Sequence, residues 1–238
     1  MAIKAVLFDL DGTLLPMDQE VFIGAYFKLL AAKLAPLGYE PEKLIDSVWK
    51  GTAAMIKNDG SCKNEDAFWR VFTEIHGETS LKDKSIIDGF YSQEFNQVKG
   101  LCGFAKEAKE VVELVKSLGK RAVLATNPLF PTVATENRMR WAGLEPADFE
   151  YYTTYENSCY CKPNPEYYKE ILDKTGLKAE ECIMVGNDVT EDMVATEALG
   201  MKVFLLTDCL INKKGDDIAK YHHGSFNELK EYLRMNLT

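Results

Sequence analysis

One short stretch near the amino terminus, residues 4–15 (KAVLFDLDGTLL), places the strongest constraint on how this chain can fold. It begins with a continuous apolar run at residues 5–8, which is typical of a strand buried on both faces of a parallel sheet. Asp9 follows directly, Asp11 comes two residues later, and Gly12 permits a sharp turn. Because open α/β sheets bind ligands at the carboxyl edge of their strands, the stretch predicts a functional site there.

The spacing of the two acids narrows the chemistry of this site. Carboxylates this close repel each other unless a cation or a shared proton relieves the repulsion, so the pair predicts either a metal ion or one acid that stays protonated. A calcium loop also begins with Asp-x-Asp, but Thr13 and Leu14 occupy positions where that loop needs an acid or amide and then a glycine. The alternative interpretation is that Asp9 and Asp11 are solvated side chains at a strand end and have no functional role.

The composition limits the kinds of partner. The chain has 238 residues, and its 28 basic and 37 acidic side chains give a net charge of −9. It contains no basic stripe, so we expect neither nucleic acid nor an anionic membrane as a partner. The first apolar run is short and ends at Asp9, unlike a signal peptide or a membrane span. We therefore expect a cytoplasmic protein, as a monomer or a small homo-oligomer.

The cysteines form no paired Cys-x-x-Cys framework. Of the six, only Cys159 and Cys161 are close together, and no histidine stands near them in the sequence. We expect reduced thiols rather than disulfides or a soft-metal site.

Residues 18–99 have a purely helical pattern. Apolar residues recur at helical spacing from Val21 to Leu34, and Pro36 and Gly38 end that segment. The segment is long enough for a four-helix bundle inserted as a module. Further helices are expected at residues 41–57, 64–76 and 83–97.

After Gly100 the chain alternates between helices and strands. This alternation predicts a doubly wound parallel α/β sheet, Rossmann-like, with right-handed crossovers and helices on both faces. The strands are expected at residues 121–126, 149–154, 182–186 and 202–206. The helices are expected before residue 119 and at residues 131–142, 165–175, 189–199 and 225–235.

Two further segments bring polar groups to strand ends. Thr126 and Asn127 end one strand ahead of a helix marked by prolines, so a hydroxyl, an amide and free backbone N–H groups meet where an anion could bind. Lys162 stands just before Pro163-Asn164-Pro165, where Asn164 is expected to cap the next helix and Pro165 to take its first position. This entry would fix the position of the lysine.

A fourth strand end carries two more acids. Gly186 ends the strand, and Asp188 and Asp192 follow it four residues apart. Glu191 stands three residues after Asp188, as in a helix capping box. Capping is therefore the alternative to a ligand role for Asp188.

Together these motifs resemble those of the haloacid dehalogenase (HAD) superfamily of phosphohydrolases. The family's first motif, Asp-x-Asp-Gly-Thr, stands at residues 9–13, its second at Thr126, its third at Lys162, and its fourth at Asp188 and Asp192. The order along the chain is also that of the family. The resemblance implies a Rossmann-like HAD core domain at residues 1–17 and 100–238, with an all-helical cap domain at residues 18–99 inserted between the first two motifs.

The resemblance also implies a role for each residue. Asp9 would be the nucleophile that forms an aspartyl-phosphate, and Asp11 the acid that protonates the leaving oxygen and then acts as base on water. Mg²⁺ would be held by the Asp9 carboxylate, the Asp11 main-chain carbonyl and Asp188, with Asp192 supporting these ligands. The residues expected to act on the phosphoryl group are Asp9, Leu10, Asp11, Thr126, Asn127 and Lys162, with Asp9, Asp11, Thr126 and Lys162 catalytic.

The implied activity is magnesium-dependent hydrolysis of a small phosphorylated metabolite. The true haloacid dehalogenases, which resemble this fold, lack the second acid of the first motif, so Asp11 disfavours dehalogenation. Related phosphonate hydrolases use a cap lysine as a Schiff base, and residues 18–99 contain several lysines. A sugar phosphomutase of the β-phosphoglucomutase kind keeps all four motifs and is the main alternative. A catalytically silent phosphate-binding protein is the alternative outside enzymes, which the intact acids and lysine disfavour.

Overall fold

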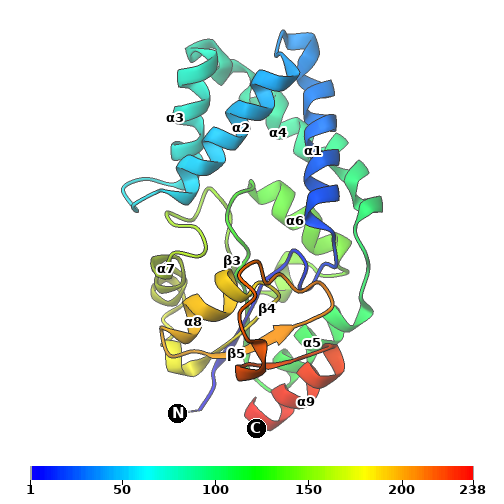
Figure 1. Ribbon diagram of the computed structural model, residues 1–238, viewed down its shortest axis with the longest axis vertical. Helices are drawn as coiled ribbons and strands as arrows, with labels where there is room; N and C mark the ends of the chain where they lie inside the picture. Colours follow the sequence, from blue (N-terminus) through cyan, green and yellow to red (C-terminus); the bar gives the residue numbers. More distant parts are fainter. Residues whose placement is uncertain (1, 238) are drawn as a thin grey trace.

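A parallel β-sheet forms the core of the lower half of the molecule in Figure 1. The structure is a computed structural model that describes residues 2–237. Over these residues six parallel strands form the sheet, in the order β3-β2-β1-β4-β5-β6. This confirms the predicted doubly wound α/β core. The strands are β1 (Ala5–Phe8), β2 (Arg121–Leu124), β3 (Tyr151–Tyr152), β4 (Cys182–Gly186), β5 (Lys202–Leu206) and β6 (His222–Gly224).

Helices cover both faces of this sheet. They are α5 (Lys106–Ser117), α6 (Thr132–Trp141), α7 (Pro165–Thr175), α8 (Ala195–Glu197) and α9 (Phe226–Leu237). Successive side chains of β1 point to opposite faces. Val6 and Phe8 belong to one buried cluster with residues of α5 and α9, whereas Ala5 and Leu7 belong to another with residues of α7. Burial on both faces explains the unbroken apolar run in the sequence.

Residues 19–101, which we call the helical segment, lie at the end of the molecule opposite to both chain ends (Figure 1). Their α-helices are α1 (Gln19–Leu34), α2 (Pro41–Ile56), α3 (Asn64–His76) and α4 (Lys84–Ser92). The prediction of one helix at residues 83–97 is wrong, because the α-helix stops at Ser92 and a 3₁₀-helix follows over Glu94–Leu101. Residues three apart share one side of a 3₁₀-helix, which lets Phe95 and Val98 both reach the core.

The helical segment meets the rest of the chain at two adjacent connections and a packed interface. Gly103 donates a backbone hydrogen bond to the carbonyl of Pro16 (2.7 Å), so the incoming and outgoing chains lie side by side. Against α6, the side-chain amide of Asn137 donates to the carbonyl of Tyr91 in α4 (2.9 Å). One continuous cluster of buried hydrophobic side chains runs from the sheet into α1–α4.

Other elements also differ from the predicted pattern. The strand expected at residues 149–154 is reduced to β3, which is an edge strand paired only with β2. The helix expected at residues 189–199 is a π-helix over Val189–Val194 followed by the short α8. Strand β6 was not predicted, because its histidines and glycine show no apolar strand pattern.

Over residues 2–237, no single helix is long and apolar enough to span a membrane; only α1 with its 3₁₀ extension (19–37) together with α2 meets the requirements of length and composition, and this pair is bent by 118°.

Candidate active site

The polar strand ends predicted from the sequence meet at one edge of the sheet. Phe8 of β1 pairs with Leu124 of β2 and with Val185 of β4, so the residues that follow these strands lie level with one another. They border a cavity of about 170 Å³, which we call the sheet-edge cavity. Six predicted site residues line it: Asp9, Asp11, Thr126, Asn127, Asp188 and Asp192.

Lys162 lies next to this cavity, between two acids. Its Nζ donates to Asp9 Oδ1 (2.8 Å) and to Asp192 Oδ1 (2.6 Å), and the lysine is only 1% exposed. Burial lowers the pKa of Lys162, but the carboxylates of Asp192 and Asp9 raise it by more, so this pKa lies well above its ordinary value. Lys162 therefore carries a fixed positive charge beside Asp9.

The loop that carries Lys162 is anchored at both ends. Asn164 Oδ1 accepts the backbone N–H of Glu166 (3.0 Å) and caps α7, and Pro165 occupies the first turn, which confirms the predicted helix start. The backbone N–H of Lys162 donates to the side-chain oxygen of Asn127 (3.3 Å). The second strand end thus helps to position the third motif.

Asp11 contacts an arginine that the sequence analysis missed. Nη1 of Arg138, in α6, donates to Asp11 Oδ2, while Asp11 Oδ1 is buried without a hydrogen-bond partner among residues 2–237. Burial raises the pKa of Asp11, and the Arg138 guanidinium opposes that rise without cancelling it. Arg138 is fully buried and lies one helical turn from the buried Ala134. A charged residue on the buried face of a predicted helix was the signal that could have identified it.

The turn after β1 positions the hydroxyl of Thr13. Gly12 has φ +86°, and a Cβ there would lie 2.4 Å from Asn187 Nδ2, so the turn requires glycine. The Thr13 hydroxyl lies 2.9 Å from Asp9 Oδ2 and 3.0 Å from Asn187 Oδ1, and can donate to either. The side chain of Leu10 is buried in the core, so Leu10 could reach a ligand only through its backbone.

Thr126 presents an unsatisfied hydroxyl at the same edge. The residue is 1% exposed, and its Oγ1 has no hydrogen-bond partner within the described part of the chain. Buried hydroxyls normally have a partner, so a ligand oxygen in the cavity is the expected one.

Asp188 and Asp192 serve as structural acceptors as well as lining the cavity. Asp188 Oδ1 caps the π-helix by accepting the N–H groups of Thr190 (2.8 Å) and Glu191 (2.9 Å), which confirms a capping role for Asp188. The Glu191 carboxylate does not complete a capping box within residues 2–237, because it accepts from Asn127 instead. The cap uses Oδ1 of Asp188. Asp192 Oδ2 accepts the N–H groups of Asn187 and Asp188, both at 3.1 Å. A Cβ at Gly186 would lie 2.2 Å from Asp192 Oδ2, so this approach requires glycine.

The donor set suits a hard divalent cation. Carboxylate and carbonyl oxygens are the ligands that Mg²⁺ prefers, and Mg²⁺ keeps several waters rather than requiring a full protein cage. Within residues 2–237 no three His, Cys, Asp or Glu side chains form a ready-made metal cluster. The predicted ligands, two carboxylates and one main-chain carbonyl, do not need such a cluster. The cavity lining is strongly acidic, with Asp9, Asp11, Asp188, Glu191 and Asp192.

Two charged lining residues, Glu191 and Lys213, were not among the predicted site residues. Glu191 Oε2 accepts from the side-chain amide of Asn127 (3.2 Å), and burial raises the pKa of Glu191. Lys213 reaches the cavity from the loop after β5. That loop has no sequence pattern that marks it as part of a site.

Comparisons with known proteins agree with this arrangement. A family model described as haloacid dehalogenase-like hydrolase matches residues 3–200. The glyceraldehyde 3-phosphate phosphatase of Methanocaldococcus jannaschii is 28% identical and aligns over 98% of this chain and 97% of its own length. The phosphoglycolate phosphatase of Vibrio parahaemolyticus is 26% identical, over 86% of this chain and 84% of its own.

Solved structures share the fold. An HAD phosphatase from Thermococcus onnurineus superposes with a TM-score of 0.59 at 18% identity, covering 97% of this chain and 98% of that one. A 2-haloacid dehalogenase from Pseudomonas syringae gives a TM-score of 0.62 at 18% identity, covering 98% and 99%. The family model spans most of the chain, and the sheet, motif order and relatives agree with it. This chain therefore belongs to the haloacid dehalogenase-like hydrolase family and is an enzyme, as its sequence motifs predict.

Proposed function

We propose that this enzyme is a magnesium-dependent phosphomonoesterase that works through an aspartyl-phosphate on Asp9. The observation that carries the proposal is the set of groups at one cavity: Asp9 and Asp11, the unpartnered hydroxyl of Thr126, and the charged Lys162 bonded to Asp9. A nucleophile, an acid and phosphoryl-binding groups are what this chemistry needs. The names of the relatives as phosphatases support the same reaction class.

The proposed reaction has two steps. In the first, a carboxylate oxygen of Asp9 attacks phosphorus, the bond from phosphorus to the leaving oxygen breaks, and Asp11 gives that oxygen its proton. In the second, Asp11 takes a proton from water, which attacks the phosphorus and frees Asp9. Lys162 holds one Asp9 oxygen and neutralises phosphoryl charge, while Thr126 and Asn127 donate to phosphoryl oxygens.

The acidity of the site supports a bound cation. The five acidic lining residues outnumber the three nearby cations, Lys162, Lys213 and Arg138, so a phosphate dianion would be repelled unless further positive charge is added. The carboxylates of Asp9 and Asp188 and the carbonyl of Asp11 would hold Mg²⁺, with Asp192 orienting the loop beside them. When bound, Mg²⁺ supplies the charge that lets a carboxylate approach the phosphate.

We also propose that residues 18–99 act as a cap domain on a core domain of residues 1–17 and 100–238. Gln19, Phe22 and Ile23 of α1 contribute to the wall of the sheet-edge cavity, so access to that cavity depends on the helical segment. The volume of about 170 Å³ suits a small phosphorylated metabolite. No lysine from residues 18–99 is among the described lining residues, which disfavours Schiff-base phosphonate chemistry.

Release of inorganic phosphate from a panel of phosphate monoesters tests the proposal. We expect release with Mg²⁺, loss of release with EDTA, and loss in Asp9→Asn. Asp173→Asn, which changes an exposed acid on α7, is the matched control and should keep activity. If no ester releases phosphate but a hexose phosphate isomerises with a bisphosphate activator, the enzyme is a mutase. If esters bind and remain intact, it is a silent binding protein.

A further inference from the structure

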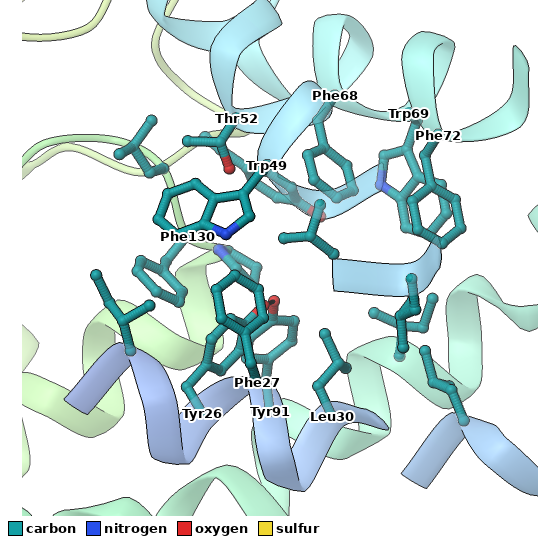
Figure 2. Close-up of a pocket in the computed structure, with 18 residues that line it drawn as sticks. Tyr26, Phe27, Leu30, Trp49, Thr52, Phe68, Trp69, Phe72, Tyr91 and Phe130 are labelled. Carbon is teal, nitrogen blue, oxygen red and sulfur yellow. Dashed lines mark hydrogen bonds between the residues drawn. The ribbon is translucent and has the colours of Figure 1, made fainter. Parts of the chain in front are cut away.

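A second cavity lies between the helical segment and residues 129–131 and 155 of the rest of the chain, and it is almost entirely apolar. Its volume is about 110 Å³, and Figure 2 shows aromatic and aliphatic side chains surrounding it, among them Phe27, Leu30 and Phe68. None of the described residues that line it is charged. Protein cores are close-packed, and an empty space forfeits dispersion contacts along its whole wall. Water would find few hydrogen-bond partners in such a space, so an apolar group is the ligand that it suits.

This apolar cavity adjoins the sheet-edge cavity. Ile23, Leu129 and Phe130 line both of them. The ring of Phe130 also lies 4.5 Å from the guanidinium of Arg138, which binds Asp11. A ligand that begins at the acids and extends past Phe130 would thus reach the apolar cavity without crossing the helical segment.

The indole N–H of Trp69 faces the apolar cavity beside the hydroxyl of Tyr155, which also lines it. Trp69 is 7% exposed, and its indole N–H makes no hydrogen bond of normal geometry to any residue from 2 to 237. Figure 2 shows the indole nitrogen on the cavity side of the ring. The hydroxyls of Tyr26 and Tyr91, in contrast, bond to each other (2.8 Å). A buried indole N–H usually has an acceptor, and an acceptor atom on a ligand would supply it.

We propose that the apolar cavity binds the alcohol part of the substrate, a phosphate monoester whose phosphoryl group lies at Asp9. This inference rests on the proposed phosphomonoesterase function. An engineered apolar cavity of about 150 Å³ binds benzene, so this smaller one suits a branched or cyclic group of about five carbon atoms. A carbonyl or ether oxygen on that group would meet the Trp69 N–H. The substrate class is a phosphorylated alcohol of low polarity, unlike the substrates named for the two relatives.

The test measures kcat/KM of the wild-type enzyme for a series of n-alkyl phosphates from methyl to hexyl, with 2-phosphoglycolate as a polar reference. Burial of each added methylene group should raise kcat/KM about fourfold until the cavity is full at about five carbon atoms. The kcat/KM for pentyl phosphate should exceed that for 2-phosphoglycolate. A series in which kcat/KM does not depend on alkyl length would overturn the inference without any variant.

A variant then locates the effect. Val48, 6% exposed, lines the apolar cavity, and Val48→Phe should fill part of it and lower the pentyl-to-methyl ratio of kcat/KM by about tenfold or more. Met235→Phe introduces the same aromatic ring at a site on α9 that is 74% exposed, and should keep the wild-type ratio. Trp69→Phe should lower kcat/KM only for esters whose alcohol part carries an acceptor oxygen.

The outcomes separate this inference from the proposed function. An enzyme that hydrolyses methyl phosphate or 2-phosphoglycolate but shows no dependence on alkyl length overturns the inference and leaves the proposed function intact. A wild-type length dependence that Val48→Phe retains in a folded protein also overturns it, because another surface would then bind the alkyl chain. No phosphate release from any ester overturns the proposed function and the inference together.

Discussion

Replacing Lys162 with alanine should damage both the chemistry and the stability of this enzyme. The ammonium group lies 2.8 Å from Asp9 Oδ1 and 2.6 Å from Asp192 Oδ1, and all three side chains are buried. Removing one partner from a buried ion pair typically costs about 3–5 kcal/mol, because the remaining charge is left without compensation. Here two carboxylates would lose the same cation, so we expect a loss of unfolding free energy within that range.

The catalytic loss should appear in kcat rather than in KM. A charge that stabilises the phosphoryl group more strongly in the transition state than in the bound substrate contributes mainly to kcat. Loss of such a preorganised group lowers kcat by about 10² or more. Mg²⁺ should reduce the stability loss, since it would neutralise Asp9 in place of the lysine.

Urea denaturation with Mg²⁺ and with EDTA, together with steady-state kinetics, measures these effects. Lys169→Ala is the matched control: Lys169 is exposed on α7 and pairs with Glu166 at 2.6 Å, so its loss should cost under about 1 kcal/mol. Wild-type kcat with only a raised KM in Lys162→Ala would show that Lys162 merely binds substrate. Equal stability in the two variants would refute the account of the buried charges.

Three further predictions concern other parts of the chain. Arg138→Met should lower kcat by about 10², because Asp11 loses the guanidinium that orients it. Arg138→Lys should restore part of kcat. An unchanged kcat in Arg138→Met would show that Arg138 does not position Asp11. Asn64→Ala removes a hydrogen bond from α3 to the carbonyl of Tyr160 (3.2 Å). If the cap closes over the site, this loss should raise KM about fivefold at similar kcat. An unchanged KM would indicate a rigid accessory bundle. Burial lowers the pKa of His76 below 6.5, so the folded state binds fewer protons than the unfolded state, and stability should be complete above pH 6.5 and decrease below it. Urea midpoints from pH ~5 to ~7.5 should show this loss in the wild type and less of it in His76→Gln.

The strands that could be predicted are those whose burial leaves an unbroken apolar run. β1, β4 and β5 fall at the residues expected from such runs. β6 could not be predicted, because a three-residue edge strand is determined by its pairing with β5 and not by its own side chains. The break after Ser92 was missed because Phe95 and Val98 fit a 3₁₀ turn as well as they fit the spacing of an α-helix.

The positions of the site residues followed from topology, whereas their partners did not. Chain order and the rule for parallel sheets brought Asp9, Thr126 and Asp188 to one edge. The contact of Asp11 with Arg138 joins residues 127 positions apart and depends on how α6 packs, which no local pattern records. The apolar cavity likewise depends on the gap that α1, α2 and α3 leave against residues 129–131 and 155, so it could only be found in three dimensions.

The central claim is that Asp9 becomes phosphorylated during turnover, and chemical trapping tests it most directly. The enzyme is mixed with Mg²⁺ and a phosphate monoester that it hydrolyses, and the reaction is quenched in acid during the first turnover. Borohydride is then added, which reduces an aspartyl-phosphate to homoserine. Peptide mass spectrometry should then find homoserine at position 9, and only when substrate is present. Unmodified Asp9 in an enzyme that releases phosphate, or homoserine at another acid such as Asp188, would contradict the account.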